Sequence, residues 1–288
     1  MFDEPIGLQP YAARIGHRTA LRPTLECLRE LLQRHTEAIA FENLDSLAGE
    51  VVSLRPSVLE EKLIVGGRGG YCFEHNMLLW NVLQQCGFEV SGLAARVRWN
   101  VPPGVLTPLG HMLLKVNVAG VPYLVDAGFG GLTLTAPLRL DTQDIQQTPH
   151  EPFVVQAGSV ARTVAVLMDG EWRPLYQFAQ LEYHVPDYTA LNWFTCTSPD
   201  SVFTRTLMCA RPEVGGRHAL LGNRYTWRGL DGTIRRETLT SGGQLRRTLT
   251  EAFHIRVPDS AALSERLHAI ATGADDGAAL QLKPAPAR

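Results

Sequence analysis

A cysteine stands where a nucleophile would be expected. In residues 68–74, which read Arg-Gly-Gly-Tyr-Cys-Phe-Glu, Cys72 follows a flexible glycine pair. Apolar spacing predicts a helix over residues 72–86 that stops at Gly87. The free N–H groups and the positive dipole end of a helix N-terminus favour a thiolate over a thiol. Cys72 is therefore a candidate nucleophile, with an inert buried cysteine beside a turn as the alternative.

A histidine and an aspartate lie in a hairpin further along the chain. Strand-like residues 111–118 and 121–126 are joined by a two-residue turn. Counting outward from the turn pairs Leu113 with Asp126, so His111 lies diagonal to Asp126 on one face, about 7 Å away between backbones. A carboxylate that orients an imidazole beside a thiol suits covalent acyl transfer. A register slip of one residue would instead place the two on opposite faces, and both could be solvated groups.

The other cysteines and the histidine nearest Cys72 carry weaker signals. The chain has five cysteines, an odd number. None lies in a CxxC pair, which argues against a disulfide framework and against a zinc site, and we predict no metal. Cys86 ends an apolar helical stripe and is expected in the core. His75 lies one turn after Cys72, and we expect it to be a packing group.

The elements that must position these residues change in character near Phe88 and near Tyr188. Helical spacing dominates the first part of the chain, for example at Leu28, Leu31 and Leu32. The middle part has six strand-like segments, enough for a small barrel or sandwich: residues 93–99, 111–118, 121–126, 153–155, 163–168 and 171–178. The last part is mixed, with strands near 203–209, 217–227 and 233–240 and helices near 243–253 and 259–270.

Length and composition indicate a globular protein that acts on small molecules. The chain has 288 residues, enough for two or three subdomains, with 45% hydrophobic and 19% charged residues and a net charge of −2. It has no block of like charges typical of a nucleic-acid or membrane surface. The acidic start and the lack of an apolar stretch of about 18 residues predict a cytoplasmic protein.

These residues resemble the arylamine N-acetyltransferase family. The likeness rests on residues 68–74 around Cys72, on residues 40–44 upstream, and on three later segments in the family's order: His111, residues 125–130 and residues 198–203. It covers roughly residues 5–255. The chain has no extra segment between its strand-rich middle part and its mixed last part, and in this it is similar to the bacterial members.

The resemblance implies an α+β fold of three parts around a cysteine-protease-like Cys-His-Asp core. Residues 1–87 would form a helical bundle that carries the nucleophile, and residues 88–187 a β-barrel that carries the histidine and the aspartate. Residues 188–272 would form an α/β lid. The composition of residues 273–288, rich in Ala, Asp, Gly and Pro, predicts a disordered tail.

The resemblance also implies a ping-pong reaction with Cys72, His111 and Asp126 as catalytic residues. Cys72 would take the acetyl group from acetyl-CoA and pass it to an arylamine, arylhydrazine or arylhydroxylamine, as in xenobiotic metabolism. Acetyl-CoA would be a co-substrate, and no cofactor would be bound permanently. Whether the chain is a monomer or a homodimer stays open.

Further roles carry over by position. The resemblance places Phe41, Phe129 and Phe203 in the acceptor pocket, and it predicts a buried ion pair of Glu42 and Arg68 before the cysteine. It also places Gly130 and Gly131 at the coenzyme cleft, where a plain turn is the simpler interpretation.

Two other classes of function remain open. A Cys-His-Asp set on a similar scaffold could hydrolyse or transamidate proteins, as transglutaminase-like cysteine proteases do. A protein acceptor needs a long open groove, whereas a small amine needs an enclosed aromatic pocket. The second alternative to acyl transfer is a binding module that keeps the fold without the activity. It would be favoured if Cys72, His111 or Asp126 were absent.

Overall fold

The computed structural model describes residues 4–102 and 104–273. The predicted tail, residues 273–288, falls outside this part except for Gly273, which ends the last helix with a φ of 72°. None of the described helices is long and apolar enough to cross a membrane.

The first part of the chain is helical, as the spacing predicts. Thr24 caps the second helix by accepting a hydrogen bond from the Cys27 amide, and Leu28, Leu31 and Leu32 are buried along it. The helices of this part are α1 (Leu8–Ile15), α2 (Leu25–Ala38), α3 (Leu44–Leu47), α4 (Pro56–Leu59), the π-helix η1 (Glu60–Val65) and α5 (Cys72–Gln85). A short strand, β1 (Phe41–Glu42), lies between α2 and α3.

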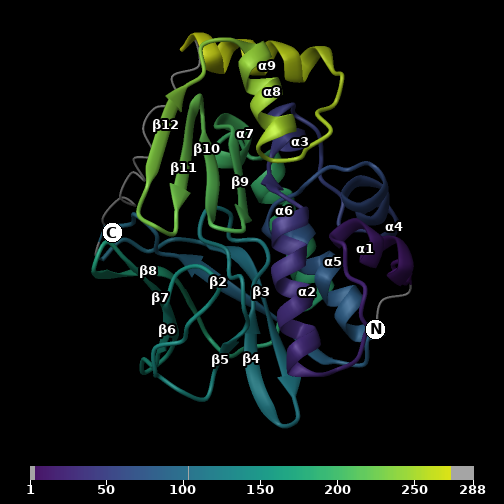
Figure 1. Cartoon of the computed structure of the whole chain (residues 1–288), viewed down its shortest axis with the longest axis vertical. Helices are drawn as coiled ribbons and strands as arrows, with labels where there is room; N and C mark the ends of the chain where they lie inside the picture. The colour runs from purple at the N-terminus through teal and green to yellow at the C-terminus, as the bar shows by residue number, and fades with distance from the viewer. Residues whose placement is uncertain (1–3, 103, 274–288) are drawn as a thin grey trace.

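Helix α5 lies beside α2, toward α1, in the view of Figure 1. Every residue from Cys72 to Leu83 is buried, so the helix is covered on all sides rather than along one stripe. The predicted end is confirmed, since Gly87 follows Cys86 with a φ of 87°. Packing around the whole helix therefore fixes the position of Cys72, its first residue.

The middle part forms one antiparallel sheet of seven strands in the order β5-β4-β3-β2-β8-β7-β6. Its ends approach each other through Gln146, whose backbone pairs with Phe153 of β6 and whose side chain binds the Arg139 backbone in β5. The sheet is therefore barrel-like. Its strands are β2 (Glu89–Val97), β3 (Leu109–Val118), β4 (Val121–Val125), β5 (Leu138–Arg139), β6 (Phe153–Gln156), β7 (Arg162–Met168) and β8 (Glu171–Phe178).

The β3–β4 hairpin has the predicted register. Ala119 and Gly120 both have positive φ, 51° and 82°, as a two-residue type I′ turn requires. Val118 pairs with Val121, and the ladder runs back to Leu114 opposite Val125. This register brings His111 and Asp126 to the same end of the hairpin.

The last part differs from the sequence prediction in three places. The strand predicted near residues 203–209 is right only at Met208 and Cys209, because Ser201 caps the short helix α7 (Val202–Arg205) and the strand begins after it. The predicted strand at 217–227 is a hairpin, β10 (Gly216–Leu221) and β11 (Arg224–Gly229), whose turn has Gly222 at a φ of 58°. The helix α6 (Val185–Thr197) was not predicted.

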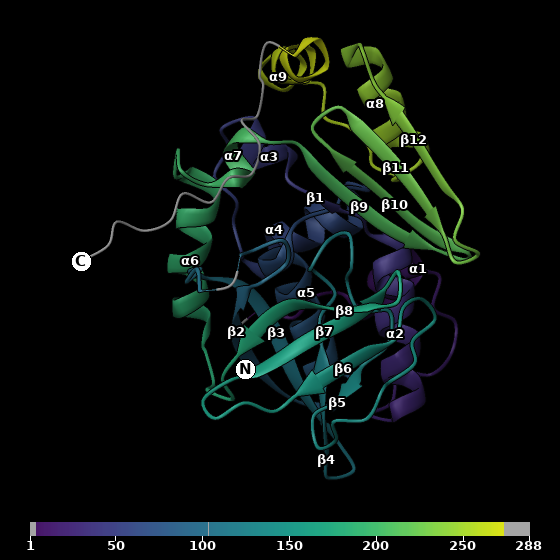
Figure 2. The ribbon, with the colours of Figure 1, turned by 90° about the vertical axis from the view of Figure 1, so that its left-hand side faces the viewer.

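A second sheet, of five strands in the order β1-β9-β10-β11-β12, lies beside the barrel-like sheet (Figure 2). The helices that pack on it agree with the predicted ones to within a few residues. The remaining elements are β9 (Met208–Glu213), β12 (Ile234–Thr238), α8 (Gly242–Glu251) and α9 (Ala261–Thr272).

The described residues form two buried apolar clusters. The larger runs from Ile6 to Cys196 and joins the N-terminal helices to the seven-stranded sheet. The smaller joins the five-stranded sheet and helices α8 and α9 to Ala40, Leu44 and Leu47 of the N-terminal part. Residues 40–47, which include Phe41 of β1, therefore contact both apolar clusters and hold the two halves of the molecule together.

Candidate active site

The glycine pair before Cys72 serves close packing rather than flexibility. A Cβ atom on Gly69 would stand 2.0 Å from the Ala40 carbonyl oxygen, and one on Gly70 would stand 2.7 Å from the Glu74 carboxylate. Neither glycine has a positive φ. The segment before the nucleophile lies flat against β1, and Gly70 pairs with Phe41 in a parallel bridge.

His111 and Asp126 form a direct, buried pair. His111 Nε2 lies 2.8 Å from Asp126 Oδ2, and the two side chains are 4% and 0% exposed. The predicted diagonal placement in the hairpin is thus realised as a hydrogen bond. A fully buried carboxylate held this way fixes the orientation of the ring.

Cys72 lies at the other side of the same imidazole. It is the first residue of α5 and is 3% exposed, and its thiol contacts the Gly110 carbonyl at 3.8 Å. Burial alone would lower the pKa of His111, but the charge and hydrogen bond of Asp126, together with a hydrogen bond to Cys72, raise it to about 10. Because Nε2 is engaged by Asp126, Nδ1 is the ring nitrogen left for the thiol.

The second oxygen of the Asp126 carboxylate is held by neighbours other than His111. Its Oδ1 accepts hydrogen bonds from Asn76 Nδ2 at 3.2 Å and from the Gly128 amide at 2.9 Å. Asn76 lies one turn after Cys72 in α5, and it also donates to the Met112 carbonyl and accepts from the Ala127 amide. One side chain therefore ties together the helix of Cys72, the strand of His111 and the loop of Asp126.

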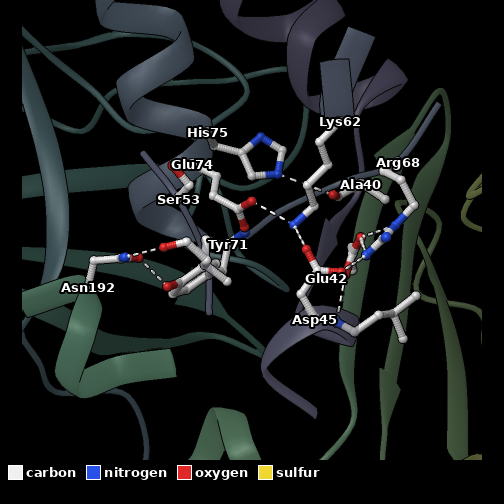
Figure 3. A network of polar contacts seen from close by, with 12 residues as sticks. Ala40, Glu42, Asp45, Ser53, Lys62, Arg68, Tyr71, Glu74, His75 and Asn192 are labelled. Carbon is white, nitrogen blue, oxygen red and sulfur yellow. Dashed lines mark hydrogen bonds and ion pairs between the residues drawn. The ribbon is translucent and has the colours of Figure 1, made fainter. Parts of the chain in front are cut away.

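A network of buried charges holds the segment that leads to Cys72 (Figure 3). Arg68 reaches Glu42 at 2.7 Å and Asp45 at 2.6 Å, and Glu42 is 0% exposed. The predicted pair of Glu42 and Arg68 is therefore buried. Lys62 of η1 extends the network, because its Nζ lies 2.6 Å from both Asp45 and Glu74.

Glu74 connects this network to the start of α5. Its Oε2 accepts a hydrogen bond from the Tyr71 amide at 3.0 Å, as a carboxylate at the third position of a helix often does. Burial raises the pKa of Glu74 to about 7, against the opposing charge of Lys62. The position of Tyr71, and of Cys72 next to it, thus depends on Lys62 through Glu74.

Aromatic rings pack against the imidazole of His111 and against Tyr71, the residue before Cys72. Phe129 packs edge-on against His111 at 5.3 Å between ring centroids, and Phe203 lies 6.2 Å from Phe41 and 5.3 Å from Tyr71. All three predicted phenylalanines are partly accessible. Tyr176, which contacts both His111 and Phe129, completes this wall.

The two glycines after Phe129 form a turn. Gly130 has a φ of 88°, and its carbonyl accepts a hydrogen bond from the Thr133 amide at 3.1 Å. A Cβ atom on Gly130 would lie 3.3 Å from the Phe41 ring, whereas nothing lies within 4 Å of one on Gly131. The turn therefore borders the aromatic wall.

The rival titratable groups are engaged elsewhere. His75 uses both ring nitrogens, one with His35 at 2.8 Å and one with the Ala40 carbonyl at 3.1 Å, and burial lowers its pKa to about 4. Burial raises the pKa of Cys86 to about 11 and also raises that of Cys209. The described residues include no group of His, Cys, Asp and Glu that would hold a metal ion.

The sequence prediction missed Asn76, Tyr176, Lys62 and Glu74. Only Glu74 carries a usable signal, a carboxylate three residues after a helix N-cap position. Asn76 lies in the same helix as Cys72, but its partners Met112, Asp126 and Ala127 meet it only in the fold. Lys62 and Tyr176 reach the site from other elements, so their roles depend on the folded arrangement.

Comparison with known proteins assigns the family. A family model described as N-acetyltransferase matches residues 24–262. The arylamine N-acetyltransferase of Mycobacterium tuberculosis is 38% identical over 258 residues, which cover 88% of this chain and 91% of that protein. The arylamine N-acetyltransferase / N-hydroxyarylamine O-acetyltransferase of Salmonella typhimurium is 37% identical over 220 residues, 76% of this chain and 78% of that protein.

Solved structures agree. The structure of Mycobacterium marinum arylamine N-acetyltransferase in complex with CoA is 38% identical, covers 92% of this chain and 99% of that one, and superimposes with a TM-score of 0.88. With a matched model over most of its length and relatives of this similarity, the chain belongs to the arylamine N-acetyltransferase family.

Proposed function

We propose that this protein transfers an acetyl group from acetyl-CoA to the nitrogen of an arylamine, arylhydrazine or arylhydroxylamine through a thioester on Cys72. The observation that carries the proposal is the buried contact of 2.8 Å between His111 and Asp126, beside a cysteine at the first position of a helix. The CoA complex and the names of the relatives support the donor and the class of acceptor.

In the first half of the reaction, His111 holds the proton of Cys72 and the thiolate attacks the carbonyl carbon of acetyl-CoA. The new C–S bond forms as the carbonyl oxygen becomes an oxyanion. The oxyanion collapses, the bond to the CoA sulfur breaks, and His111 returns its proton to that sulfur. The first N–H groups of a helix lack intrahelical partners, so the Cys72 amide is a suitable donor to the oxyanion.

In the second half, the amine nitrogen attacks the carbonyl carbon of acetyl-Cys72. Its N–H proton passes to His111, the C–S bond breaks, and Cys72 leaves as a thiolate beside the imidazolium. An arylamine is unprotonated at neutral pH and can attack directly. Asp126 stabilises the imidazolium in both halves without taking its proton.

Phe41, Phe129 and Phe203 form the acceptor pocket in this proposal. Phe129 packs against His111, and Phe41 contacts Phe203, so these rings would sandwich a flat aromatic amine. Gly130 and Gly131 border the route of the donor. The division into residues 1–87, 88–187 and 188–272 and a cytoplasmic location stay predictions.

The test is to trap the intermediate. The protein is mixed with acetyl-CoA without an acceptor, quenched in acid, and analysed by peptide mass mapping, with Cys72→Ser and Cys86→Ser as paired variants. We expect one added acetyl group on the peptide of Cys72 in the wild type and in Cys86→Ser, and none there in Cys72→Ser.

Acceptors are then added to the trapped form. Aniline, p-aminobenzoate and phenylhydrazine should remove the acetyl group and appear as N-acetyl products. An unmodified Cys72 together with unmodified acceptors would refute the proposal. Cleavage or transamidation of an unfolded protein substrate by the same preparation would favour the peptidase alternative.

A further inference from the structure

The short helix that carries Phe203 has little packing of its own. Helix α7 spans only Val202–Arg205, and none of its four residues is buried. A helix of one turn fixes several backbone angles for few hydrogen bonds and is not stable by itself. The position of Phe203, one of the rings proposed for the acceptor pocket, must therefore be fixed by polar contacts at the two ends of α7.

The N-terminal end of α7 is fixed to helix α6. The Ser201 hydroxyl accepts a hydrogen bond from the Phe203 amide at 3.2 Å and donates to the carbonyl of Thr195, in α6, at 2.6 Å. The Thr204 hydroxyl donates to the Ser198 carbonyl at 2.9 Å. These bonds hold the start of the helix and leave its last carbonyl groups to other partners.

The C-terminal end of α7 is fixed by the side chain of Asn43. Asn43 Nδ2 donates to the Phe203 carbonyl at 2.7 Å and to the Thr206 carbonyl at 2.8 Å, and Asn43 Oδ1 accepts from the Met208 amide at 2.8 Å. Carbonyl groups in the last turn of a helix have no partner within that helix. One amide, 2% exposed, thus binds both the end of α7 and the start of β9.

Arg266 of α9 also reaches this end of the helix. Its Nη2 lies 3.3 Å from the Thr204 carbonyl and 3.4 Å from the Arg205 carbonyl. Both distances exceed the usual range of about 2.7–3.2 Å for such bonds. The shorter contacts are those of Asn43, and Asn43 is the residue that binds the carbonyl of Phe203 itself.

Asn43 belongs to the segment that carries Phe41. It follows β1 directly and occupies the N-cap position of α3, yet its side chain does not cap that helix, as an asparagine there usually does. Strand β1 is held on both sides, because Phe41 pairs with Ala210 of β9 and with Gly70. Figure 2 shows α7 beside α3, which Asn43 precedes. The side chain is therefore turned away from its own helix to hold α7.

This bridge joins two rings of the aromatic wall. Phe41 and Phe203 lie 6.2 Å apart between ring centroids, and the amide of Asn43, two residues after Phe41, binds the backbone of Phe203. Phe41 stays in its strand whether or not α7 moves. The distance between the two rings is thus set at the Phe203 side, where Asn43 acts.

Resting on the proposed function, we propose that Asn43 is a positioning residue that determines the size of the acceptor. It holds Phe203 against Phe41, so that the pocket fits closely around a single aromatic ring. Without it, α7 is loose at one end. A one-ring amine then loses its orientation toward the acetyl group, whereas an amine with two rings gains room and still contacts the wall.

The test measures the second half of the reaction alone. Acetyl-enzyme is formed with acetyl-CoA, freed of CoA by rapid gel filtration, and mixed with aniline or with 4-aminobiphenyl. The second-order rate constant for loss of the acetyl group is measured for each amine. In Asn43→Ala we expect the constant for aniline to fall about tenfold and that for 4-aminobiphenyl to stay within about twofold or to rise.

Asn81→Ala is the matched control. Asn81 is also 2% exposed, and its side chain also makes three hydrogen bonds, with the Ile6 amide, the Glu4 carbonyl and the Gln85 side chain. These partners lie at the N-terminus and at the end of α5, away from α7. The control should lose stability as Asn43→Ala does and keep the wild-type preference between the two amines.

Two further measurements address α7 itself. Ser201→Ala loosens the other end of the helix and leaves Asn43 in place, so it should shift the preference toward 4-aminobiphenyl as well. Hydrogen exchange gives a readout without turnover. The peptide of residues 203–208 should exchange faster in Asn43→Ala than in Asn81→Ala, because the Met208 amide has lost its acceptor.

The possible failures are distinguishable. If the wild type forms no acetyl group on Cys72, the proposed function fails. If it does, and Asn43→Ala keeps the wild-type preference or slows both amines equally, Asn43 is a stabilising group only and the function stands. Should Asn43→Ala not fold, an unchanged preference in Ser201→Ala would refute the inference.

Discussion

The backbone of Gly128 lies directly against the backbone of Cys72. A Cβ atom on Gly128 would stand 2.5 Å from Cys72 Cα and 3.1 Å from the Cys72 carbonyl oxygen. The loop that follows Asp126 and the first turn of α5 therefore touch with no side chain between them. This contact sets how closely the sulfur and the imidazole approach each other.

Gly128→Ala should accordingly lower activity by more than its effect on folding suggests. The new methyl group meets the Cys72 backbone and the Asn76 side chain. The loop or the helix must therefore shift, and a misplacement of about 1 Å costs about a hundredfold in rate. We expect kcat/KM to fall about a hundredfold. Gly243→Ala is the control, because only one atom lies near its added Cβ, at 3.9 Å. Equal activity in the two variants would show that the contact is not limiting.

Asp126→Asn should nearly abolish turnover. The amide keeps the shape of the side chain but loses the charge that supports the imidazolium, and it can hold the ring in the wrong tautomer. We expect kcat to fall about 10³–10⁴-fold, as such a change does in serine-protease triads. Rapid-quench measurement of acetyl-enzyme formation checks it. A variant that keeps a tenth of wild-type activity would contradict the role of Asp126.

The His111–Asp126 pair should make stability depend on pH on the alkaline side. The pKa of His111 in the folded protein is about 10, above the usual 6.5 of an unfolded chain. The folded state therefore binds this proton more tightly, and the stabilisation is fully present below about pH 6.5 and is lost as pH rises toward 10.

Denaturant titrations in a Cys72→Ser background isolate this effect, because the thiol no longer titrates. The difference in unfolding free energy between this protein and its Asp126→Asn derivative should shrink between pH 6.5 and 10. A difference that stays constant over this range would show that the pKa of His111 is not raised.

Lys62→Met should destabilise the protein strongly, and more at pH 8 than at pH 5. The change leaves Glu74, which is 1% exposed, without its cation, and breaking a buried pair costs about 3–5 kcal/mol. The pKa of Glu74 is already raised to about 7 by burial and should rise further. A carboxyl whose pKa is raised in the folded state favours folding when protonated, so stability falls as pH rises through that pKa.

Two companion variants sharpen this measurement. Lys62→Met/Glu74→Gln removes the orphaned charge and should recover much of the loss and most of the pH dependence. Lys115→Met, at a half-buried lysine of β3 outside the network, controls for the loss of a lysine. Equal destabilisation by the two single variants at pH 8 would argue against the network.

The pairing of His111 with Asp126 was predictable because a short turn fixes a register. Once the chain reverses at Ala119 and Gly120, each residue of β3 has one possible partner in β4, and the ladder up to Leu114 and Val125 follows by counting. The relation of Cys72 to His111 has no such local rule. It depends on α5 packing against β3, which the family resemblance implied and periodicity alone did not.

The helix that was not predicted, α6, lacked an apolar pattern. Helix α6 buries the polar residues Asn192 and Thr195 and leaves Trp193 and Phe194 more than half exposed, so apolar positions do not mark its inner face. The hairpin at 216–229 did carry a signal, since Gly222-Asn223 is a typical two-residue turn. Lys62 had none, because its partners Asp45 and Glu74 meet it only in the fold.

Asn76 should prove to be a positioning residue. It binds Asp126, the Met112 carbonyl and the Ala127 amide at once, so Asn76→Ala frees the loop of Asp126 from α5 and leaves buried polar groups unpaired. Asn81→Ala is the matched control, because Asn81 is buried in the same helix and binds the Ile6 amide, far along the helix from Cys72. Both variants should lose about 1–3 kcal/mol of stability. Assayed well below either unfolding transition, only Asn76→Ala should lose kcat, by about ten- to a hundredfold, with KM for the acceptor little changed. Equal kcat in the two variants would reduce Asn76 to a stabilising group.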